Sequence, residues 1–221
     1  YKLVESGRGR SGPTYEFNTN LNFSVPKVPA KESAKLKEKA EQIIKSAGVV
    51  NGYCLVIGST DAELLVELAR ESNFSVISLR QGTVSGYSPR MRLDLVVNAM
   101  FKSAMVDHVI TVNNPAIWRP VLSIDDAAKA YIRAIEAHEE ISGIFNIASG
   151  NYTVGEIGEL VKQGVEEDLG IKIKLKIKKI KDYRNYKVSA EKAKKIINFN
   201  PSNNISTIVK DLGNNKDKFK D

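Results

Sequence analysis

The chain has 221 residues, of which 42% are hydrophobic and 27% charged, and its formal net charge is +7. This size and balance suit one globular unit with a buried core, and they exclude a disordered chain. No apolar run approaches the roughly 18 residues that span a bilayer, and no signal peptide pattern opens the chain, so we expect a cytoplasmic protein without a membrane partner.

The first 70 residues combine an irregular segment with the opening of an α/β unit. Residues 1–30 are rich in Gly, Pro, Asn and Ser, which is typical of irregular chain that adds little to a core. Residues 31–47 carry apolar side chains at helical spacing and predict an amphipathic helix. Residues 53–57 form a short apolar run that leads through a turn at 58–61 into a helix. Strand, tight turn and helix in this order are typical of a Rossmann-like unit.

The single cysteine, Cys54, lies within that apolar run. A cysteine in such surroundings behaves as a small buried hydrophobe, so we do not expect it to act as a nucleophile or to bind a metal. A lone cysteine also excludes a disulfide within the chain.

The middle of the chain alternates strands with helices. Apolar runs predict strands at residues 74–79, 109–112, 121–124 and 144–148. Helical periodicity predicts a helix over residues 92–105, and Asp125 is placed to cap another that ends near His138, because its side-chain oxygen can accept from first-turn amides. Thr153 and Glu156 have the spacing of a capping box at the start of a further helix.

The C-terminal part of the chain holds many of the lysines that give it a positive charge. Residues 171–178 alternate an aliphatic side chain with lysine, which is the period of a strand with one buried and one exposed face. Such lysines protect a sheet edge, and no basic helix with interleaved aromatic residues accompanies them, so nucleic acid is not expected as a partner. Two short helices, from about Ser189 and Ile205, complete the chain.

This order of elements predicts an α/β fold with a Rossmann-like, mostly parallel sheet and a smaller C-terminal α/β region. Strands of a parallel sheet are covered on both faces and are apolar throughout. We therefore expect the side chains of Leu55, Val76, Ile77 and Ile147 to be buried.

Five segments follow one another in an order that points to a known family. A strand is followed by an Arg and a Gly-x-x-Pro turn; an Arg precedes paired aspartates; a Phe-Asn strand comes next; a basic segment and a Phe-x-Pro turn close the pattern. These segments are residues 79–92, 118–128, 144–150, 182–189 and 199–201. Together they resemble the substrate-binding half of the extended short-chain dehydrogenase/reductases, of the NAD-dependent epimerase/dehydratase type that acts on nucleotide-sugars.

The resemblance implies a set of substrate-binding residues. In the family, arginines at the positions of Arg119 and Arg184 converge on the diphosphate of a nucleotide-sugar, Asn98 binds near the phosphates or the sugar, and Thr83 stands where a polar side chain faces the sugar. Planar guanidinium groups suit a diphosphate because they form charge-assisted, often bidentate hydrogen bonds. The alternatives are a surface ion pair for Arg119 and a structural hydroxyl for Thr83. Two aspartates, Asp125 and Asp126, are interpreted as a helix cap and its neighbour, not as a catalytic pair.

The family also requires NAD or NADP, held by a glycine-rich turn, and a Tyr-x-x-x-Lys pair for proton transfer. The turn after residues 53–57 offers one glycine, Gly58, and resembles the first motif of class I methyltransferases more than a dinucleotide-binding turn, although it also lacks the Gly-x-Gly of that motif. Tyr183 and Lys187 have the required spacing but lie too far along the chain, so Lys187 is expected on a strand face. The catalytic residues are therefore not identified by the sequence.

The resemblance divides the chain into an irregular segment (1–30), a Rossmann-like portion (31–106) and a substrate-binding portion (107–221) packed on the same core. The leading hypothesis is an NAD(P)-dependent nucleotide-sugar epimerase or dehydratase, truncated, fused or with a substitute N-terminal half. The alternatives are a non-catalytic nucleotide-sugar-binding protein and a degenerate methyltransferase-like protein. A nucleotide-sugar is the expected partner, and a homodimer is left open.

Overall fold

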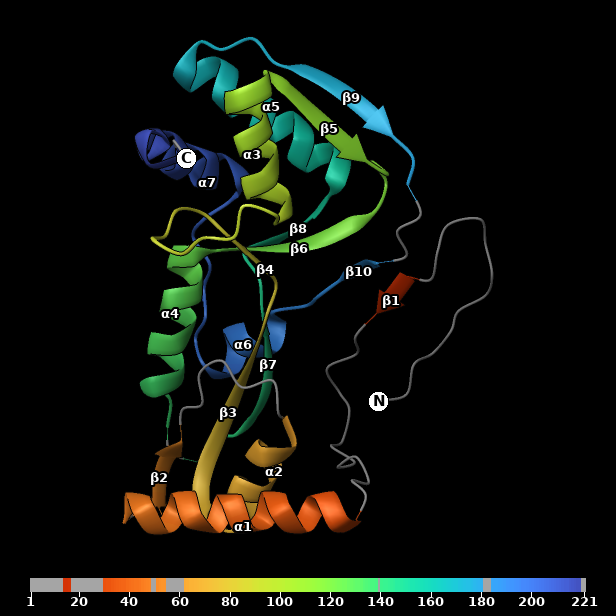
Figure 1. Ribbon diagram of the computed structural model, residues 1–221. Helices are drawn as coiled ribbons and strands as arrows, with labels where there is room; N and C mark the ends of the chain where they lie inside the picture. The colour runs from red at the N-terminus through yellow and green to blue at the C-terminus, as the bar shows by residue number, and fades with distance from the viewer. Residues whose placement is uncertain are drawn as a thin grey trace.

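The computed structural model describes residues 14–16, 30–48, 51–54, 62–138, 140–180 and 184–219. Figure 1 shows a long body with helices α1 and α2 at one end and helices α3, α5 and α7 at the other. The strands β3 and β7 run between these two ends, with α4 and α6 beside them. Two expectations, for Leu55 and Gly58, fall outside the described residues, as do most of residues 1–30.

One end of the body is built from α1 (Ala30–Ala47), β2 (Asn51–Cys54) and α2 (Ala62–Arg70). The two helices pack through a cluster formed by Ala40, Ile44, Leu64 and Leu68. The predicted helices over residues 31–47 and 62–70 are confirmed. Strand β2 pairs in parallel with β3, which agrees with the predicted Rossmann-like order.

The strand pairings follow the predicted preference for parallel neighbours. Strand β3 (Asn73–Gln81) lies between β2 and β7 (Gly143–Ile147), and both pairings are parallel. Among the remaining described strands, β1 (Thr14–Glu16) pairs with β10 (Asn185–Lys187), β4 (Thr83–Ser85) with β6 (Trp118–Ser123), and β5 (Val109–Asn113) with β9 (Lys174–Lys178), all in parallel. Only β8 (Gly150–Thr153) runs antiparallel within the described part, against β6.

The mostly parallel fold is thus confirmed, but the described strands form several short sheets and not one continuous sheet. The chain changes from one sheet to the next at Gly82, between β3 and β4. Its amide still donates to the carbonyl of Ile147 in β7 at 2.8 Å. A Cβ at this position would lie 3.0 Å from the carbonyl oxygen of Pro120 in β6, so only glycine allows the strands of the two sheets to come this close.

The opposite end holds the larger apolar core. It forms between α3 (Val96–Asp107), α5 (Val154–Leu169), α7 (Ile205–Asn214) and β5, around buried side chains such as Phe101 and Val161. The capping box is confirmed, because Thr153 Oγ1 accepts from the amide of Glu156 and the Glu156 carboxylate accepts from the amide of Thr153. The helix predicted to begin at Arg92 begins instead at Val96, because the preceding residues form a loop in which Arg92 pairs with Asp94 at 2.6 Å.

A second core lies on one face of the β3–β7 pair. Helices α4 (Ile124–Ile135) and α6 (Glu191–Ile196) cover this face. The core beneath them includes the buried side chains of Phe145 and Ile147 in β7 and of Phe199 after α6. The buried position of Ile147 is confirmed, whereas Ile77 is only half-buried. The side chain of Val76 lies outside the described part.

The prediction that Asp125 caps α4 is wrong. The cap is Ser123, whose side chain accepts from the amide of Asp126 at 3.0 Å. Strand β6 ends at Ser123, so the serine and not the aspartate occupies the extended position that a cap requires. Asp125 lies in the first turn and is exposed.

The alternating segment at residues 171–178 forms β9 over its second half, but not with a clean buried face. Leu175 is half-buried, and Ile177 keeps 70% of its surface exposed. Strand β9 pairs only with β5 within the described chain and therefore lies at an edge. The described part of the chain ends, after α7, in a 3₁₀ turn at Lys216–Phe219.

No helix in the described ranges combines the length and the apolar character that a membrane-spanning segment needs.

Candidate functional site

Residues 184–189, which include β10, lie against the antiparallel pair β6–β8 (Figure 1), and we call this segment the strap. The strap forms a ladder with β1 but none with β6 or β8. Its contacts with those strands come from side chains. The amide of Trp118 in β6 donates to Asn185 Oδ1 at 2.8 Å. Asn151 in β8 accepts from the amide of Val188 at 3.0 Å and donates to its carbonyl at 2.9 Å.

The strap brings the two predicted arginines together. Arg119 Nη1 donates to the main-chain carbonyl of Trp118 at 2.9 Å and to the carbonyl of Arg184. Residues 65 positions apart in the chain are thereby joined through one guanidinium group. Arg119 is half-buried and Arg184 is exposed, and each side chain carries a permanent positive charge.

Another cation of the strap, Lys187, contacts the residue of β6 that precedes Arg119. Lys187 Nζ is 3.4 Å from the centre of the Trp118 ring, a cation–π contact. The nearby Glu156 is occupied by its capping box: hydrogen bonds from the amide and hydroxyl of Thr153 hold the pKa of the Glu156 carboxyl below its ordinary value, and Lys187 acts in the same direction. Lys187 lies on β10 as expected and is exposed. Tyr183, its partner in the Tyr-x-x-x-Lys spacing, falls outside the described residues.

Asn98 has a different place from Arg119 and Arg184. It is 1% exposed, and its side chain fastens the loop between β4 and α3: Oδ1 accepts from the amide of Gly86 at 3.0 Å and Nδ2 donates to the carbonyl of Arg92 at 3.1 Å. Thr83 lies in β4, where it is the register partner of Val121 in β6. Arg119 therefore meets the main chain of Arg184, and Thr83 lies on the strand next to that of Arg119. A contact of Asn98 with a substrate stays a prediction.

Sequence reasoning missed the side-chain amides that hold the strap. Asn151 and Asn185 gave no signal, because an isolated asparagine in a polar stretch is typical of any turn. It also missed the network around Asp126, a fully buried carboxylate that accepts from Ser149, Ser202 and Asn203 at 2.7–3.1 Å. Burial alone would raise the pKa of Asp126, but these hydrogen bonds outweigh burial and lower the pKa to about 2. Asp126 thus holds the chain before α7 to the start of α4.

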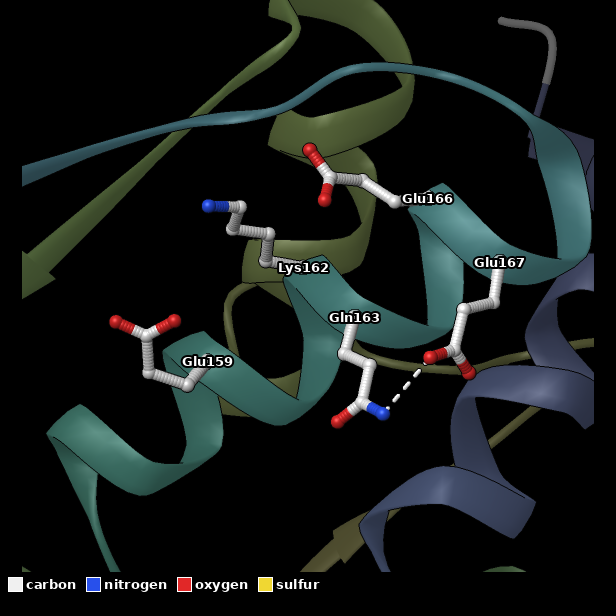
Figure 2. A pocket seen from close by; sticks show the side chains of 5 residues that line it. All are labelled: Glu159, Lys162, Gln163, Glu166 and Glu167. Atoms are coloured by element: carbon white, nitrogen blue, oxygen red, sulfur yellow. Dashed lines mark hydrogen bonds between the residues drawn. The ribbon is translucent and has the colours of Figure 1, made fainter.

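Two surface hollows lie elsewhere. One, of about 270 Å³, follows α5 and is drawn in Figure 2, where Gln163 donates to Glu167 at 2.8 Å. The other, of about 300 Å³, lies between Lys129 and Arg133 of α4 and the chain at residues 198–200. Neither is lined by a predicted site residue. No group of three His, Cys, Asp or Glu side chains within the described ranges is arranged to hold a metal ion.

The described residues do not by themselves fit a dinucleotide. A pyrophosphate cradle needs glycines that leave the backbone open to the ligand at the start of a helix. The glycines at the ends of β3 and β4 are instead packed against the chain: Gly82 faces Pro120, and a Cβ on Gly86 would lie 3.1 Å from Ile124. Gly58, the one candidate from the sequence, lies outside the described part.

The fold has many solved counterparts. An ADP-L-glycero-D-manno-heptose-6-epimerase from Helicobacter pylori aligns with a TM-score of 0.54 at 18% identity, over 73% of this chain and 53% of its own. The UDP-glucuronic acid 4-epimerase of Bacillus cereus, solved with UDP-glucuronic acid and NAD, aligns with a TM-score of 0.59 at 18% identity, over 76% and 59%. The Pseudomonas aeruginosa protein RMD, solved with NADPH, gives 0.61 at 12% identity, over 80% and 70%.

At these identities the structures establish a shared fold, and the chain spans only 53% and 59% of the two epimerases. The family described as the NAD dependent epimerase/dehydratase family matches residues 60–148. This stretch runs from the start of α2 to the end of β7, and it includes Thr83, Asn98 and Arg119. Over residues 60–148, the chain is therefore similar to the NAD dependent epimerase/dehydratase family.

Proposed function

We propose that this protein binds a nucleotide-sugar at the β6–strap surface and takes part in its NAD(P)-dependent epimerisation or dehydration. The observation that carries the proposal is the bond from Arg119 to the carbonyl of Arg184, because it joins the two residues that the family resemblance assigns to a diphosphate. The family match over residues 60–148 supports the same chemistry. Isomerase or lyase activity, a cytoplasmic location and a homodimer belong to this proposal as well.

The proposal has a physical basis in the way Arg119 is held. Both of its main-chain bonds come from Nη1, so the plane of the guanidinium group is fixed by β6 on one side and by the strap on the other. A fixed guanidinium loses little side-chain entropy when an anion binds. Arg184 and Lys187 add positive charge to the strap, so the surface suits a ligand that carries two negative charges close together, as a diphosphate does.

NAD(P) would accept and return the hydride, and the residues described here would bind and orient the sugar-nucleotide. Since these residues do not cradle a dinucleotide, no hydride or proton step is assigned to them. Thr83 and Asn98 remain in the proposal as residues near the sugar, Thr83 as a direct polar contact and Asn98 through the loop that it fastens.

The first prediction tests Arg119. Replacing Arg119 with alanine should weaken the binding of UDP- or GDP-sugars by about 10- to 100-fold, because one charge-assisted contact is lost. Isothermal titration calorimetry measures this directly. Arg119→Lys keeps the charge without the planar fork and should recover only part of the affinity.

Arg133→Ala is the matched control, since Arg133 lies on α4 and pairs with Glu136 at 2.8 Å. It should bind as the parent does. A parent protein that binds none of these nucleotide-sugars, or an Arg119→Ala variant with unchanged affinity, would contradict the proposal.

A second candidate is a nucleotide-sugar-binding protein without catalysis. It is favoured by the sequence, in which the one Tyr-x-x-x-Lys spacing, Tyr183 to Lys187, falls far downstream of the place that the family resemblance gives to the proton-transfer pair. Incubation of the protein with NAD and the best-bound nucleotide-sugar, followed by NMR of the sugar, separates the two candidates. A new epimer or a dehydrated sugar supports the enzyme, and an unchanged sugar supports the binding protein.

A further inference from the structure

The strap is held to β6 and β8 by side chains. Strands normally fix their register through main-chain ladders, in which each residue is aligned by its neighbours. The strap has no ladder with β6 or β8. Its position over these strands therefore depends on a few side chains, of which Asn151 makes the most complete contact.

Asn151 satisfies both main-chain groups of a single strap residue. Its Oδ1 accepts from the amide of Val188 and its Nδ2 donates to the carbonyl of Val188, at 3.0 and 2.9 Å. This is the same exchange of bonds that two paired strand residues make, carried out by one amide side chain. Asn185 makes one bond with the amide of Trp118 at 2.8 Å, and the bond from Asn146 Nδ2 to the carbonyl of Ser189 is long at 3.4 Å.

The strap carries two cationic residues into its contacts with β6. The carbonyl of Arg184 accepts from the Arg119 guanidinium, and Lys187 Nζ lies 3.4 Å from the centre of the Trp118 ring. The positions of both residues therefore depend on how the strap is seated over β6.

We propose that Asn151 is a positioning residue of the anion site: through Val188 it fixes the strap so that the carbonyl of Arg184 meets Arg119 and Lys187 covers Trp118. The inference rests on the proposed function for its ligand, but its structural part can be measured without one. Trp118 is the only tryptophan of the chain and lies beneath Lys187, so its fluorescence reports whether the strap is seated.

The experiment compares the parent with Asn151→Ala and with Asn114→Gly. Asn114 is a matched control because it makes the same two-way contact with a different residue: Nδ2 donates to the carbonyl of Ile180 at 2.7 Å and Oδ1 accepts from its amide at 3.0 Å. Its φ is +52°, so glycine removes the side chain without adding backbone strain. Both variants should lose stability by similar amounts in urea unfolding.

Only Asn151→Ala should change the site. We expect iodide to quench Trp118 more strongly in this variant, and calorimetry should show about five- to thirtyfold weaker binding of UDP and of inorganic pyrophosphate. Asn114→Gly should match the parent in both measurements.

The outcomes distinguish the positioning role of Asn151 from the proposed function. Unchanged quenching of Trp118 in Asn151→Ala overturns the inference, whatever the parent binds. Increased quenching with unchanged affinity for both anions overturns it too, because the strap would then move without affecting the site. A parent that binds pyrophosphate but no UDP- or GDP-sugar refutes the proposed function and leaves the positioning role to be decided by the pyrophosphate titration. A parent that binds neither refutes both.

Discussion

Asp126 carries a negative charge with none of its surface exposed to solvent. A buried carboxylate is tolerated only when hydrogen bonds replace its hydration, and here donors from Ser149, Ser202 and Asn203 do so. Lys129 adds an ion pair at 3.6 Å. The carboxylate therefore stabilises the fold only in its charged form, which makes stability depend on pH.

The sign of that dependence follows from the pKa of Asp126, which is lowered to about 2 from an ordinary 3.8. The contribution of Asp126 is fully present above about pH 4 and is lost as the pH falls toward 2, because the unfolded chain takes up the proton first. Urea unfolding between about pH 5 and pH 2 should show this loss in the parent. Asp126→Asn should be less stable by about 2–4 kcal/mol at neutral pH and should lack this part of the acid dependence.

Asp125→Asn is the natural control, since Asp125 is exposed on the same turn of α4. Its stability should stay within about 0.5 kcal/mol of the parent. If Asp125→Asn and Asp126→Asn lost the same stability, the network around Asp126 would not be the cause.

At the level of elements, the contact between α5 and β5 shows how packing overrides local preference. Gly158 lies inside α5, where glycine is a poor helix former. A Cβ at this position would lie 2.6 Å from Cγ2 of Val112 in β5, so any larger side chain would force the helix away from the strand. The glycine is retained because it lets the helix and the strand approach closely.

Gly158→Ala should accordingly destabilise the protein by about 1–3 kcal/mol, although alanine is the better helix former by about 1 kcal/mol. Gly213→Ala in α7 provides the comparison. Its Cβ would meet Leu169 at 3.8 Å, an ordinary contact, so this variant should be neutral or slightly stabilised. Thermal unfolding of the two variants decides the matter, and a stabilised Gly158→Ala would show that the close approach is not tight.

At the scale of the whole molecule, elements that depend on local sequence were predicted well. Thr153 and Glu156 form their capping box because both partners lie within one turn. The cap of α4 was misassigned because the choice between Ser123 and Asp125 depends on where β6 ends, which its pairing with β4 and β8 determines. The aliphatic side chains of residues 171–178 were expected to share one buried face. Ile177 is instead exposed, on a strand, β9, that lies at an edge.

The residues of the candidate site were likewise predicted only in part. The nearness of Arg119 and Arg184 was predicted from a family resemblance, which already carries three-dimensional information. The ties made by Asn151 and Asn185 were not predicted, because their partners lie far along the chain and are chosen by tertiary approach. Gly58 and the remaining cofactor question lie outside the described residues.

The network around Asp126 also has a consequence for the order in which the protein folds. Its carboxylate and the amides that satisfy it are 76 and 77 residues apart, a separation that belongs to the slow, non-local contacts of folding. During synthesis, α4 leaves the ribosome long before Ser202 and Asn203 do. Until then Asp126 has the donor Ser149 but lacks those of residues 202 and 203, so its burial under α4 is only partly compensated. The core around Phe145 and Phe199 is therefore expected to form late, once residue 203 has emerged.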